Sequence, residues 1–552
     1  MIVLTCPRYC VNVFQQVIQV FEGELRQHLY YDVRYELTEN LSFLNGQNVT
    51  LMIIFGSQHI PNLKDLTTKA SYTIIYNLEQ LHFQKWKSLM DRWKNEDGVD
   101  EIWDYSNCNI AEMTSYDASL GMKCRKMKLG YSPFFSNESM KSLGLDKRLA
   151  FIGNISDYRL KVMENISAPF KVYNQHYFND YQQIVAQHNA FLNIHFQEPA
   201  ILEVVRILPL VCSRKYIYSQ SSCDSELDEI FSPLVHFSNN VSDVRQLGPE
   251  DLEEWRLTSE PKFQEFRMKH ALKNILSDVF IQHPQWLLPK TLKFCIATLH
   301  CNNRQTIFKT IQTFLDNTKI HPVMELEWVI LSQGCSDEHN EEIEECFKKS
   351  GWSIRLVIIP LLVNMGWSNG MNELYQYINE QQFTLVLHLE DDWICDSSTT
   401  GTTWLMDSLI FMTHHNSIST MFLRQYRSDS EKQHYGWTRS FRYNCFKQTG
   451  EPFNYQHKIK STSKFHFRSL ELREIPCFMY TANPTLFRLR HYFDAGVFPF
   501  PVYRDASNNQ IHWSTTTAMD APEWGQAEAI SMEKLLPYRC MNVGKGIFYH
   551  HF

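Results

Sequence analysis

Residues 383–394 read FTLVLHLEDDWI and are the most informative segment of the chain. Its first seven residues are almost entirely apolar, which is typical of a strand buried on both faces of a parallel sheet. Three consecutive carboxylates, Glu390, Asp391 and Asp392, follow directly. Adjacent like charges are unfavourable unless a positive charge joins them, and a hard divalent cation is the obvious partner. We therefore expect an α/β domain with Mn²⁺ or Mg²⁺ at the carboxyl end of this strand, although a solvated loop would also explain an isolated acidic triplet.

The composition is that of a folded protein with several domains. The chain has 552 residues, more than one hydrophobic core usually holds, and is 44% hydrophobic and 21% charged. A net charge of −8 gives no general attraction to nucleic acid or to anionic membranes. The longest apolar stretch, residues 356–363, is too short to span a bilayer, and the fourteen cysteines form no Cys-x-x-Cys pair. We expect a cytoplasmic, reduced protein with no transmembrane segment and no nucleic-acid partner.

The first block, residues 1–245, alternates short apolar strands with helices. This alternation is typical of parallel sheets in α/β proteins. A boundary divides the block into halves of about 1–140 and 147–245, as a pair of sheets flanking a cleft would require. Residues 246–289 carry apolar side chains among charges and are expected to form a helical connector. The expected strands of the first block include residues 51–55, 72–76 and 149–152.

The second block, residues 290–552, begins with a strand at 292–297 and a turn at 298–303. A helix follows, with an apolar stripe between residues 307 and 315. Further strands and helices alternate up to the acidic triplet, with strands at 327–331 and 354–358 and helices at about 341–349 and 369–378. Four strands with three intervening helices predict a Rossmann-like, nucleotide-binding half.

Three segments of the second block resemble a family 2 (GT-A) nucleotide-sugar glycosyltransferase. Residues 296–304, IATLHCNNR, are similar to the family's opening strand and nucleotide-contacting turn. Residues 364–372, NMGWSNGMN, are similar to its N-x-G-x-x-x-G/A-x-N segment, and the acidic triplet takes the place of its DxD motif. The usual acidic stretch after the second strand reads LSQGCSD here, at residues 331–337, so no carboxylate is obvious there for the base or ribose. The resemblance implies donor contacts from Thr298, Arg304, Asn372, Glu390 and Asp391, and metal ligands from Asp391 and Asp392.

The resemblance also implies roles near the end of the chain. Residues 520–528, DAPEWGQAE, resemble the late acidic segment in which a carboxylate deprotonates the acceptor hydroxyl. Glu523, Glu528 and Asp520 compete for this role, and helix capping or simple surface exposure is the alternative. His550, or the histidine after it, would complete the metal shell, unless both histidines face solvent.

The first block resembles the GT-B glycosyltransferases of bacteria and large DNA viruses, which have two Rossmann halves and need no metal. The likeness rests on YNLEQ at 76–80, IWDYS at 102–106, FIGN at 151–154 and LNIHF at 192–196. It implies that a glycine turn and helix N-termini hold the donor diphosphate, with donor contacts from Gly153, Asn154, His195 and Ser222, and that Glu203 binds a sugar or ribose hydroxyl. Alternatively, Glu203 and Arg206 simply pair on a helix surface.

Together the two resemblances predict a bifunctional, hexosyltransferase-type glycosyltransferase with a GT-B-like and a GT-A module. It would transfer a sugar from a nucleotide-sugar donor to a hydroxyl of a glycan or glycoprotein acceptor, with Mn²⁺ or Mg²⁺ in the second module. In a second interpretation only the second module is catalytic, and the first binds the acceptor or serves as a scaffold. In a third, both blocks are binding modules without catalysis. The sequence leaves open whether the transfer inverts or retains configuration.

Overall fold

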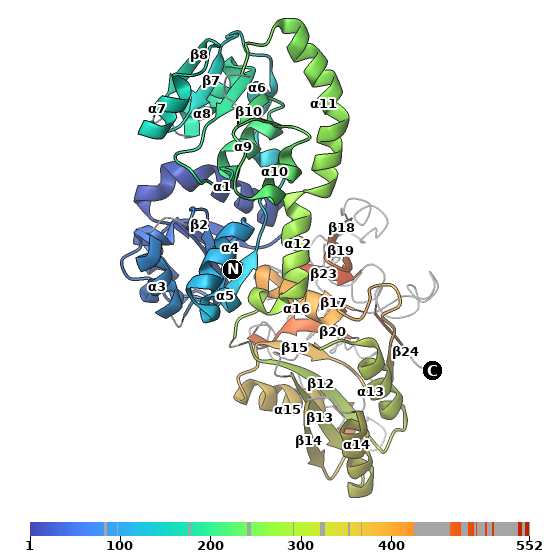
Figure 1. The fold of residues 1–552 in the computed structure, drawn as a ribbon. Coiled ribbons are helices and arrows are strands. Elements are labelled where there is room, and N and C mark those ends of the chain that lie inside the picture. Colours follow the sequence, from blue (N-terminus) through green and yellow to red (C-terminus); the bar gives the residue numbers. More distant parts are fainter. Residues whose placement is uncertain are drawn as a thin grey trace. The chain divides into compact units, whose positions relative to one another are not determined.

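The computed structural model divides into two compact units, Met1–Pro289 and Lys290–Phe552, each with its own α/β core (Figure 1). The structure describes the whole chain except residues 82–85, 96–97, 175–177, 240–243, 291, 321–325, 351–353, 366, 424–463, 476–483, 491–492, 494–502, 505–510, 513–538, 544–546 and 551–552.

The first unit begins with a six-stranded parallel sheet in the order β2-β1-β3-β4-β5-β6. Its strands are β1 (Ile2–Cys6), β2 (Val33–Leu37), β3 (Leu51–Phe55), β4 (Tyr72–Asn77), β5 (Glu101–Asp104) and β6 (Cys124–Lys126). The helices of this half are α1 (Val11–Gly23), α2 (Lys64–Thr67), α3 (Lys87–Asn95), α4 (Asn107–Tyr116) and α5 (Ala118–Lys123). All five residues of β1 and of β3 are buried, as expected for central strands that helices cover on both faces.

The second half of this unit contains a five-stranded parallel sheet in the order β11-β10-β9-β7-β8. Its strands are β7 (Leu149–Ile152), β8 (Phe170–Tyr173), β9 (Ala190–Asn193), β10 (Tyr216–Ser219) and β11 (His236–Phe237). Its helices are α6 (Glu138–Lys141), α7 (Asp157–Met163), α8 (Phe178–Gln187), α9 (Val204–Cys212) and α10 (Ser225–Phe231). The chain leaves β7 for β8 on one side and returns to β9 on the other, so the strand order reverses between β7 and β9.

The predicted connector forms two helices, α11 (Pro249–Lys269) and α12 (Leu272–Gln282). The junction between them is tied to the first unit, because the Tyr131 carbonyl accepts a hydrogen bond from the Leu272 amide at 2.8 Å. The two halves of the unit are also linked, since the Ser106 hydroxyl donates to Asp224 Oδ2 at 2.6 Å. No helix in the described part of the chain is long and apolar enough to cross a membrane.

The second unit is built on a nine-stranded mixed sheet in the order β14-β13-β12-β15-β20-β17-β23-β19-β18. Its strands are β12 (Phe294–Cys301), β13 (Leu326–Gln333), β14 (Arg355–Leu361), β15 (Leu385–His388), β17 (Ile418–Phe422), β18 (Lys464–Phe467), β19 (Leu470–Ile475), β20 (Thr485–Arg488) and β23 (Arg539–Val543). The strands β12 to β15 are parallel, and β20 is antiparallel to β15. Two short antiparallel pairs are also described in this unit: β16 (Trp393–Cys395) with β24 (Phe548–His550), and β21 (Tyr503–Arg504) with β22 (Ile511–His512).

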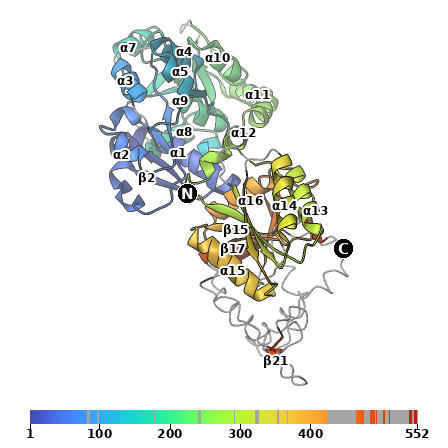
Figure 2. The ribbon, with the colours of Figure 1, turned by 90° about the horizontal axis from the view of Figure 1, so that it is seen from below.

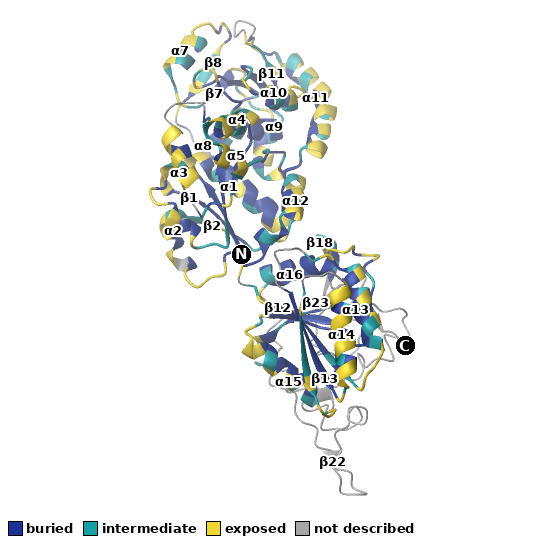
Figure 3. Ribbon diagram, turned by 60° about the horizontal axis from the view of Figure 1, so that its bottom comes forward, coloured by how far each residue is buried: buried dark blue, intermediate teal, exposed yellow. Residues whose placement is uncertain are grey.

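Helices cover both faces of this sheet. α15 (Trp367–Glu380) lies on one face, and α13 (Thr306–Asn317) and α14 (Asp337–Ser350) lie on the other (Figures 1 and 2). A fourth helix, α16 (Trp404–His414), is buried along most of its length. On the α13 and α14 face the buried Trp328 ring contacts Phe314 and Phe347 edge-on. The central strands are accordingly dark in Figure 3, whereas the outer surfaces of the helices are exposed.

The predicted α/β class, with Rossmann-like parallel sheets and a mixed sheet, is confirmed. One local expectation is wrong. The turn predicted for residues 298–303 starts only after Cys301, because β12 continues in register with β13 until Cys301 lies opposite Gln333. The polar side chains that suggested a turn, such as His300, are buried and hydrogen-bonded instead.

Candidate functional site

The first candidate site lies where the strand order of the second unit reverses. The chain runs outward from β12 to β13 and β14, then crosses back to β15 on the other side of β12. Ligands of open α/β sheets bind in the crevice at such a reversal, at the carboxyl ends of the strands. Arg304 follows β12 and the acidic triplet follows β15, so both predicted elements are at this edge.

Asp391 is the best-held residue of the triplet. Its side chain is only 4% exposed, and its two oxygens have different partners. His300 Nδ1 donates to Asp391 Oδ2 at 2.7 Å, and Arg304 Nη1 donates to Oδ1 at 3.2 Å. The same guanidinium nitrogen lies 4.0 Å from Asp392 Oδ2. The charge of Asp391 raises the pKa of Arg304, so the guanidinium stays fully charged beside two carboxylates.

A second histidine extends the contact inward. His300 Nε2 lies 2.9 Å from His339 Nε2, and the two rings are stacked with centroids 5.1 Å apart. His300 donates from Nδ1 to a carboxylate, and its Nε2 lies within hydrogen-bond distance of His339 Nε2. Burial is the largest cause that lowers the pKa of His339, and this favours its neutral form. The sequence analysis missed this buried Asp-His-His chain, and its one signal is a histidine inside an apolar strand.

The described hydrogen bonds of Thr298 and Glu390 go to tryptophan side chains rather than to this cluster. The Thr298 hydroxyl is buried inside β12 and accepts from Trp328 Nε1 at 2.9 Å, a contact within the core. Glu390 accepts from Trp393 Nε1 at 3.0 Å, which closes the turn into β16. Asn372 is half-buried on α15. The described hydrogen bonds and ion pairs thus bring together Arg304, Asp391 and Asp392.

Hydrogen bonds join the loops around the site to one another. Asn302 and Asn303 have positive φ values of 55° and 53°, and Asn303 Oδ1 accepts from the Ser336 amide at 3.0 Å. Gln333, in the stretch where the family has an acidic residue, is buried and accepts from the Met365 amide at 3.0 Å. A Cβ at Gly370 would lie 2.7 Å from Gln333 Nε2 and 2.7 Å from Leu299 Cδ1, so a larger residue there requires these two side-chain ends to shift.

The proposed acceptor residues Asp520, Glu523 and Glu528 lie outside the described residues. His550 is described in its backbone only, as part of β24, where it pairs with Trp393 immediately after Asp392. Its backbone therefore lies at the edge of the acidic triplet, and its role as a metal ligand stays a prediction.

The fit of a divalent cation depends on what the substrate supplies. No group of three or more His, Cys, Asp or Glu side chains in the described part of the chain is arranged to hold a metal ion. Mn²⁺ and Mg²⁺ in nucleotide sites commonly take only one or two protein carboxylates, and diphosphate oxygens and water complete the shell. Asp391 and Asp392 fit that smaller ligand set.

The second candidate site lies at the reversal between β7 and β9 in the first unit. Gly153 follows β7 directly, and His195 follows β9 after one residue. Glu203, at the N-terminus of α9, joins them, because His195 Nδ1 donates to Glu203 Oε2 at 2.9 Å. His195 Nε2 also donates, to the Ser221 carbonyl at 3.1 Å. With both ring nitrogens donating to oxygen acceptors, His195 is an imidazolium cation.

The pKa values follow from these contacts. Burial lowers the pKa of His195, but the hydrogen bond and charge of Glu203 outweigh burial and raise it above 6.5. Burial likewise raises the pKa of Glu203, but the His195 hydrogen bond and the Arg206, His195 and Arg159 charges lower it from 4.5 to about 2. Glu203 is therefore ionised at neutral pH, and its charge favours the protonated form of His195.

Two arginines give the site a net positive charge. Arg159 is buried and donates from Nε to the Ile194 carbonyl at 2.9 Å. Burial, and then Arg206, lower its pKa to about 9. A guanidinium nitrogen of Arg159 lies 3.6 Å from Glu203 Oε1, and one of Arg206 lies 3.9 Å from the same atom. The Glu203 side chain is 15% exposed. Glu203 and Arg206 are therefore not a simple surface pair, and three cations surround one carboxylate.

The glycine turn faces these cations. A Cβ at Gly153 would lie 3.2 Å from Arg206 Nη2 and 3.4 Å from Arg159 Nη1. The Asn154 carbonyl accepts from Arg159 Nη1. Ser222 follows Ser221 directly, but its hydroxyl donates to Asp228 Oδ1 at 2.8 Å rather than to a member of this cluster. The contacts thus join Gly153, Asn154, His195 and Glu203, four of the five predicted donor contacts.

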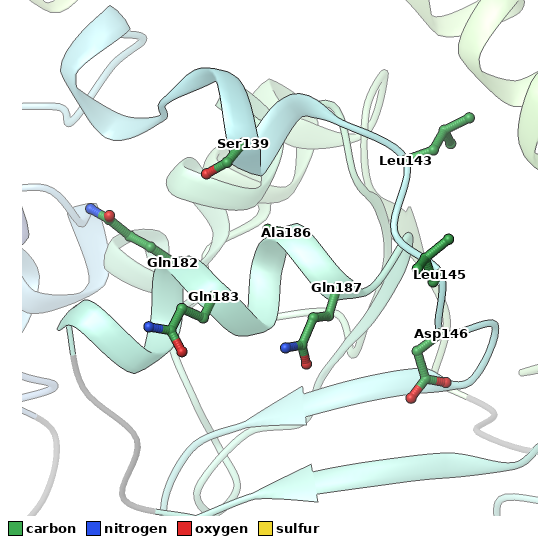
Figure 4. Close-up of a pocket in the computed structure, with 8 residues that line it drawn as sticks. All are labelled: Ser139, Leu143, Leu145, Asp146, Gln182, Gln183, Ala186 and Gln187. Carbon is green, nitrogen blue, oxygen red and sulfur yellow. The ribbon is translucent and has the colours of Figure 1, made fainter.

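A large open cavity of about 980 Å³ lies near the amino ends of the strands of the same sheet. It is lined by α6, α8 and the segment before β7, including Leu145, Asp146 and Gln187 (Figure 4). Asp146 precedes β7 and Gln187 precedes β9, so the cavity lies at the amino ends of these strands. Ligands of such sheets bind at the carboxyl ends, so we assign this cavity no role.

No protein-family model and no curated protein matches this chain. Several solved structures are similar to about half of it. Residues 1–349 of S. aureus TarS, solved with UDP, are 14% identical, with 47% of this chain and 61% of that chain covered and a TM-score of 0.30. Anabaena HepE, solved with UDP, is 9% identical, with 51% and 99% covered and a TM-score of 0.35. A Pyrobaculum calidifontis mannosyltransferase, solved with GDP-Man and Mn²⁺, is 10% identical, with 48% and 60% covered and a TM-score of 0.27. This chain thus spans 61% of the length of that TarS chain, and likenesses of this strength carry no conclusion about activity.

Proposed function

We propose that the protein is a glycosyltransferase whose second unit transfers a sugar from a nucleoside-diphosphate donor to a hydroxyl of a glycan or glycoprotein. One observation carries the proposal: Arg304, Asp391 and Asp392 converge where the strand order reverses between β12 and β15. Two carboxylates and an arginine at that edge match the chemistry of a diphosphate with its cation.

The residues of the site have distinct tasks in this proposal. Asp391, held by His300, and Asp392 would bind Mn²⁺ or Mg²⁺, with His550 as a further ligand. When bound, the cation supplies Lewis-acid stabilisation of the charge on the departing diphosphate. Arg304 presents a planar guanidinium, which pairs with phosphate oxygens in two parallel hydrogen bonds.

The acceptor hydroxyl needs a base, since a sugar hydroxyl is a poor nucleophile at neutral pH. Glu523 or Glu528 is proposed for this role, with Asp520 as the third candidate. Direct displacement by the activated hydroxyl would invert the sugar's configuration.

The first unit is proposed to bind a second donor without metal. The cluster of His195, Arg159 and Arg206 around Glu203 leaves a net positive charge beside the glycine turn at Gly153. Such a setting compensates a diphosphate without a cation. A specific alternative is that this unit binds the acceptor or serves as a scaffold, in which case only the second unit is catalytic.

A donor screen tests the proposal. The intact chain is heated with UDP-, GDP-, dTDP- and CMP-sugars, with and without Mn²⁺, because a selective ligand raises the melting temperature by mass action. We expect one class of donor to stabilise the protein more with Mn²⁺ than with EDTA. The extra stabilisation should disappear in D392N and persist in D316N, which neutralises an exposed carboxylate on α13 of the same unit. Equal stabilisation of D392N and the native chain would rule out Asp392 as the cation ligand.

A further inference from the structure

Arg304 occupies the position at which the cation is proposed to bind. Its Nη1 atom lies 3.2 Å from Asp391 Oδ1 and 4.0 Å from Asp392 Oδ2. The other oxygen of Asp391 is already engaged by His300 at 2.7 Å. A cation that binds at Oδ1, the oxygen without a histidine partner, therefore meets the atom that Arg304 uses.

Hydrogen bonds hold the loop that precedes Arg304, whereas the Arg304 side chain is half exposed. The Asn302 amide donates to the Gln333 carbonyl at 3.1 Å, and Asn303 Oδ1 accepts from the Ser336 amide at 3.0 Å. The Arg304 side chain itself is 52% exposed, and the carboxylate that it contacts is buried. The guanidinium can therefore turn away from Asp391 without any movement of the loop.

We propose that Arg304 is an exchangeable counter-ion, which neutralises Asp391 and Asp392 when no nucleotide is bound and moves to the donor diphosphate when the cation binds. The inference rests on the proposed function of this site. A guanidinium suits both positions, because carboxylate and phosphate oxygens offer it the same paired geometry. The ion pair of Arg304 with the two carboxylates has to break both when the cation binds and when Arg304 moves to the diphosphate. Binding of either ligand therefore favours binding of the other.

The test measures cation binding directly rather than activity. MnCl₂ alone is titrated into the intact chain, and free Mn²⁺ is followed by its paramagnetic resonance signal. Native protein is compared with R304Q and with the matched control R355Q. Arg355 pairs with Glu327 at 3.1 Å at the start of β14, at the other end of the sheet, and its side chain is 75% exposed.

R304Q should bind Mn²⁺ more tightly than the native chain, on the order of tenfold. This size is expected because the ion pair joins a half-exposed arginine to a buried carboxylate, and so lies between fully exposed and fully buried ion pairs in strength. R355Q should bind Mn²⁺ like the native chain. In the presence of Mn²⁺, R304Q should also bind UDP and GDP more weakly, because the diphosphate has lost its arginine.

Mn²⁺ affinity in R304Q that equals or falls below the native value overturns the counter-ion role while leaving the proposed function intact. Unchanged affinity for UDP and GDP in the presence of Mn²⁺ overturns the transfer of Arg304 to the diphosphate. If neither native protein nor R304Q binds Mn²⁺, even with UDP or GDP, the cation site itself is absent, and the proposed function fails together with this inference. A melting curve of R304Q confirms that the variant is folded.

Discussion

Replacement of Glu203 by glutamine is the most informative perturbation of the first unit. Glu203 is ionised and held by His195 and by two guanidinium groups. Its pKa falls from 4.5 to about 2, and each pKa unit is worth about 1.4 kcal/mol, so its ionised form contributes roughly 3 kcal/mol to folding at neutral pH. The raised pKa of His195 reports the same contact with Glu203, so its free energy is not counted a second time. E203Q also leaves the buried Arg159 without its carboxylate, which increases the loss.

The stability that the Glu203–His195 contact contributes depends on pH. The lowered pKa of Glu203 means stability that is present above pH 4.5 and lost as the pH falls towards about 2. The raised pKa of His195 means stability that is present below pH 6.5 and lost as the pH rises through its folded value. The contact therefore stabilises the unit most between pH 4.5 and 6.5. In E203Q both dependences should disappear.

Amide hydrogen exchange with mass spectrometry on the intact chain can localise the effect. Peptides that cover β9 and α9 should exchange faster in E203Q than in the native chain near pH 6, and the difference should shrink above the His195 pKa. Peptides of the second unit should not change and serve as the internal control. Equal protection of β9 and α9 in both proteins would refute the buried ion pair.

Three further results are expected. H300N should leave one oxygen of the buried Asp391 with a weaker partner and lower stability by about 1–3 kcal/mol, measured by urea unfolding; an unchanged midpoint would contradict the hydrogen bond. G370A should change the stability of the second unit by less than about 1 kcal/mol, since its Cβ would meet only the movable ends of the Gln333 and Leu299 side chains and alanine favours the helix; a fall in melting temperature that corresponds to about 3 kcal/mol would show that these side chains cannot shift. A fragment of residues 290–552 should be soluble and show α/β circular dichroism, because it has its own core; solubility only together with the first unit would indicate an essential interface.

The fold could be predicted where local pattern and final environment agree. The runs at β3 and β7 are short, apolar and bounded by turn residues, and the structure gives them the expected bounds. β12 runs further than expected, because its polar end is buried against β13 and bonded to partners that no local window includes. A burial pattern of this kind depends on tertiary contacts, which override local polarity.

The same distinction applies to the site. The acidic triplet and Arg304 are visible in the sequence, because charged residues beside an apolar strand stand out. The chain from Asp391 to His300 and His339 is not visible, because it joins residues 91 and 39 positions apart. Thr298 was predicted as a nucleotide contact from its place in a motif, whereas the structure shows its hydroxyl bonded to Trp328 in the core. Pairing of this kind follows from sheet order, which the local pattern does not encode.

Calorimetric titration with UDP- and GDP-sugars tests whether the acidic triplet binds the donor through a cation. Native protein and D392N are compared in Mn²⁺ and in EDTA. We predict a binding event in the native chain that EDTA abolishes and that D392N lacks, while any donor binding by the first unit persists in all four conditions. Metal-dependent binding that is as strong in D392N as in the native chain would contradict the assignment of the acidic triplet as the donor site.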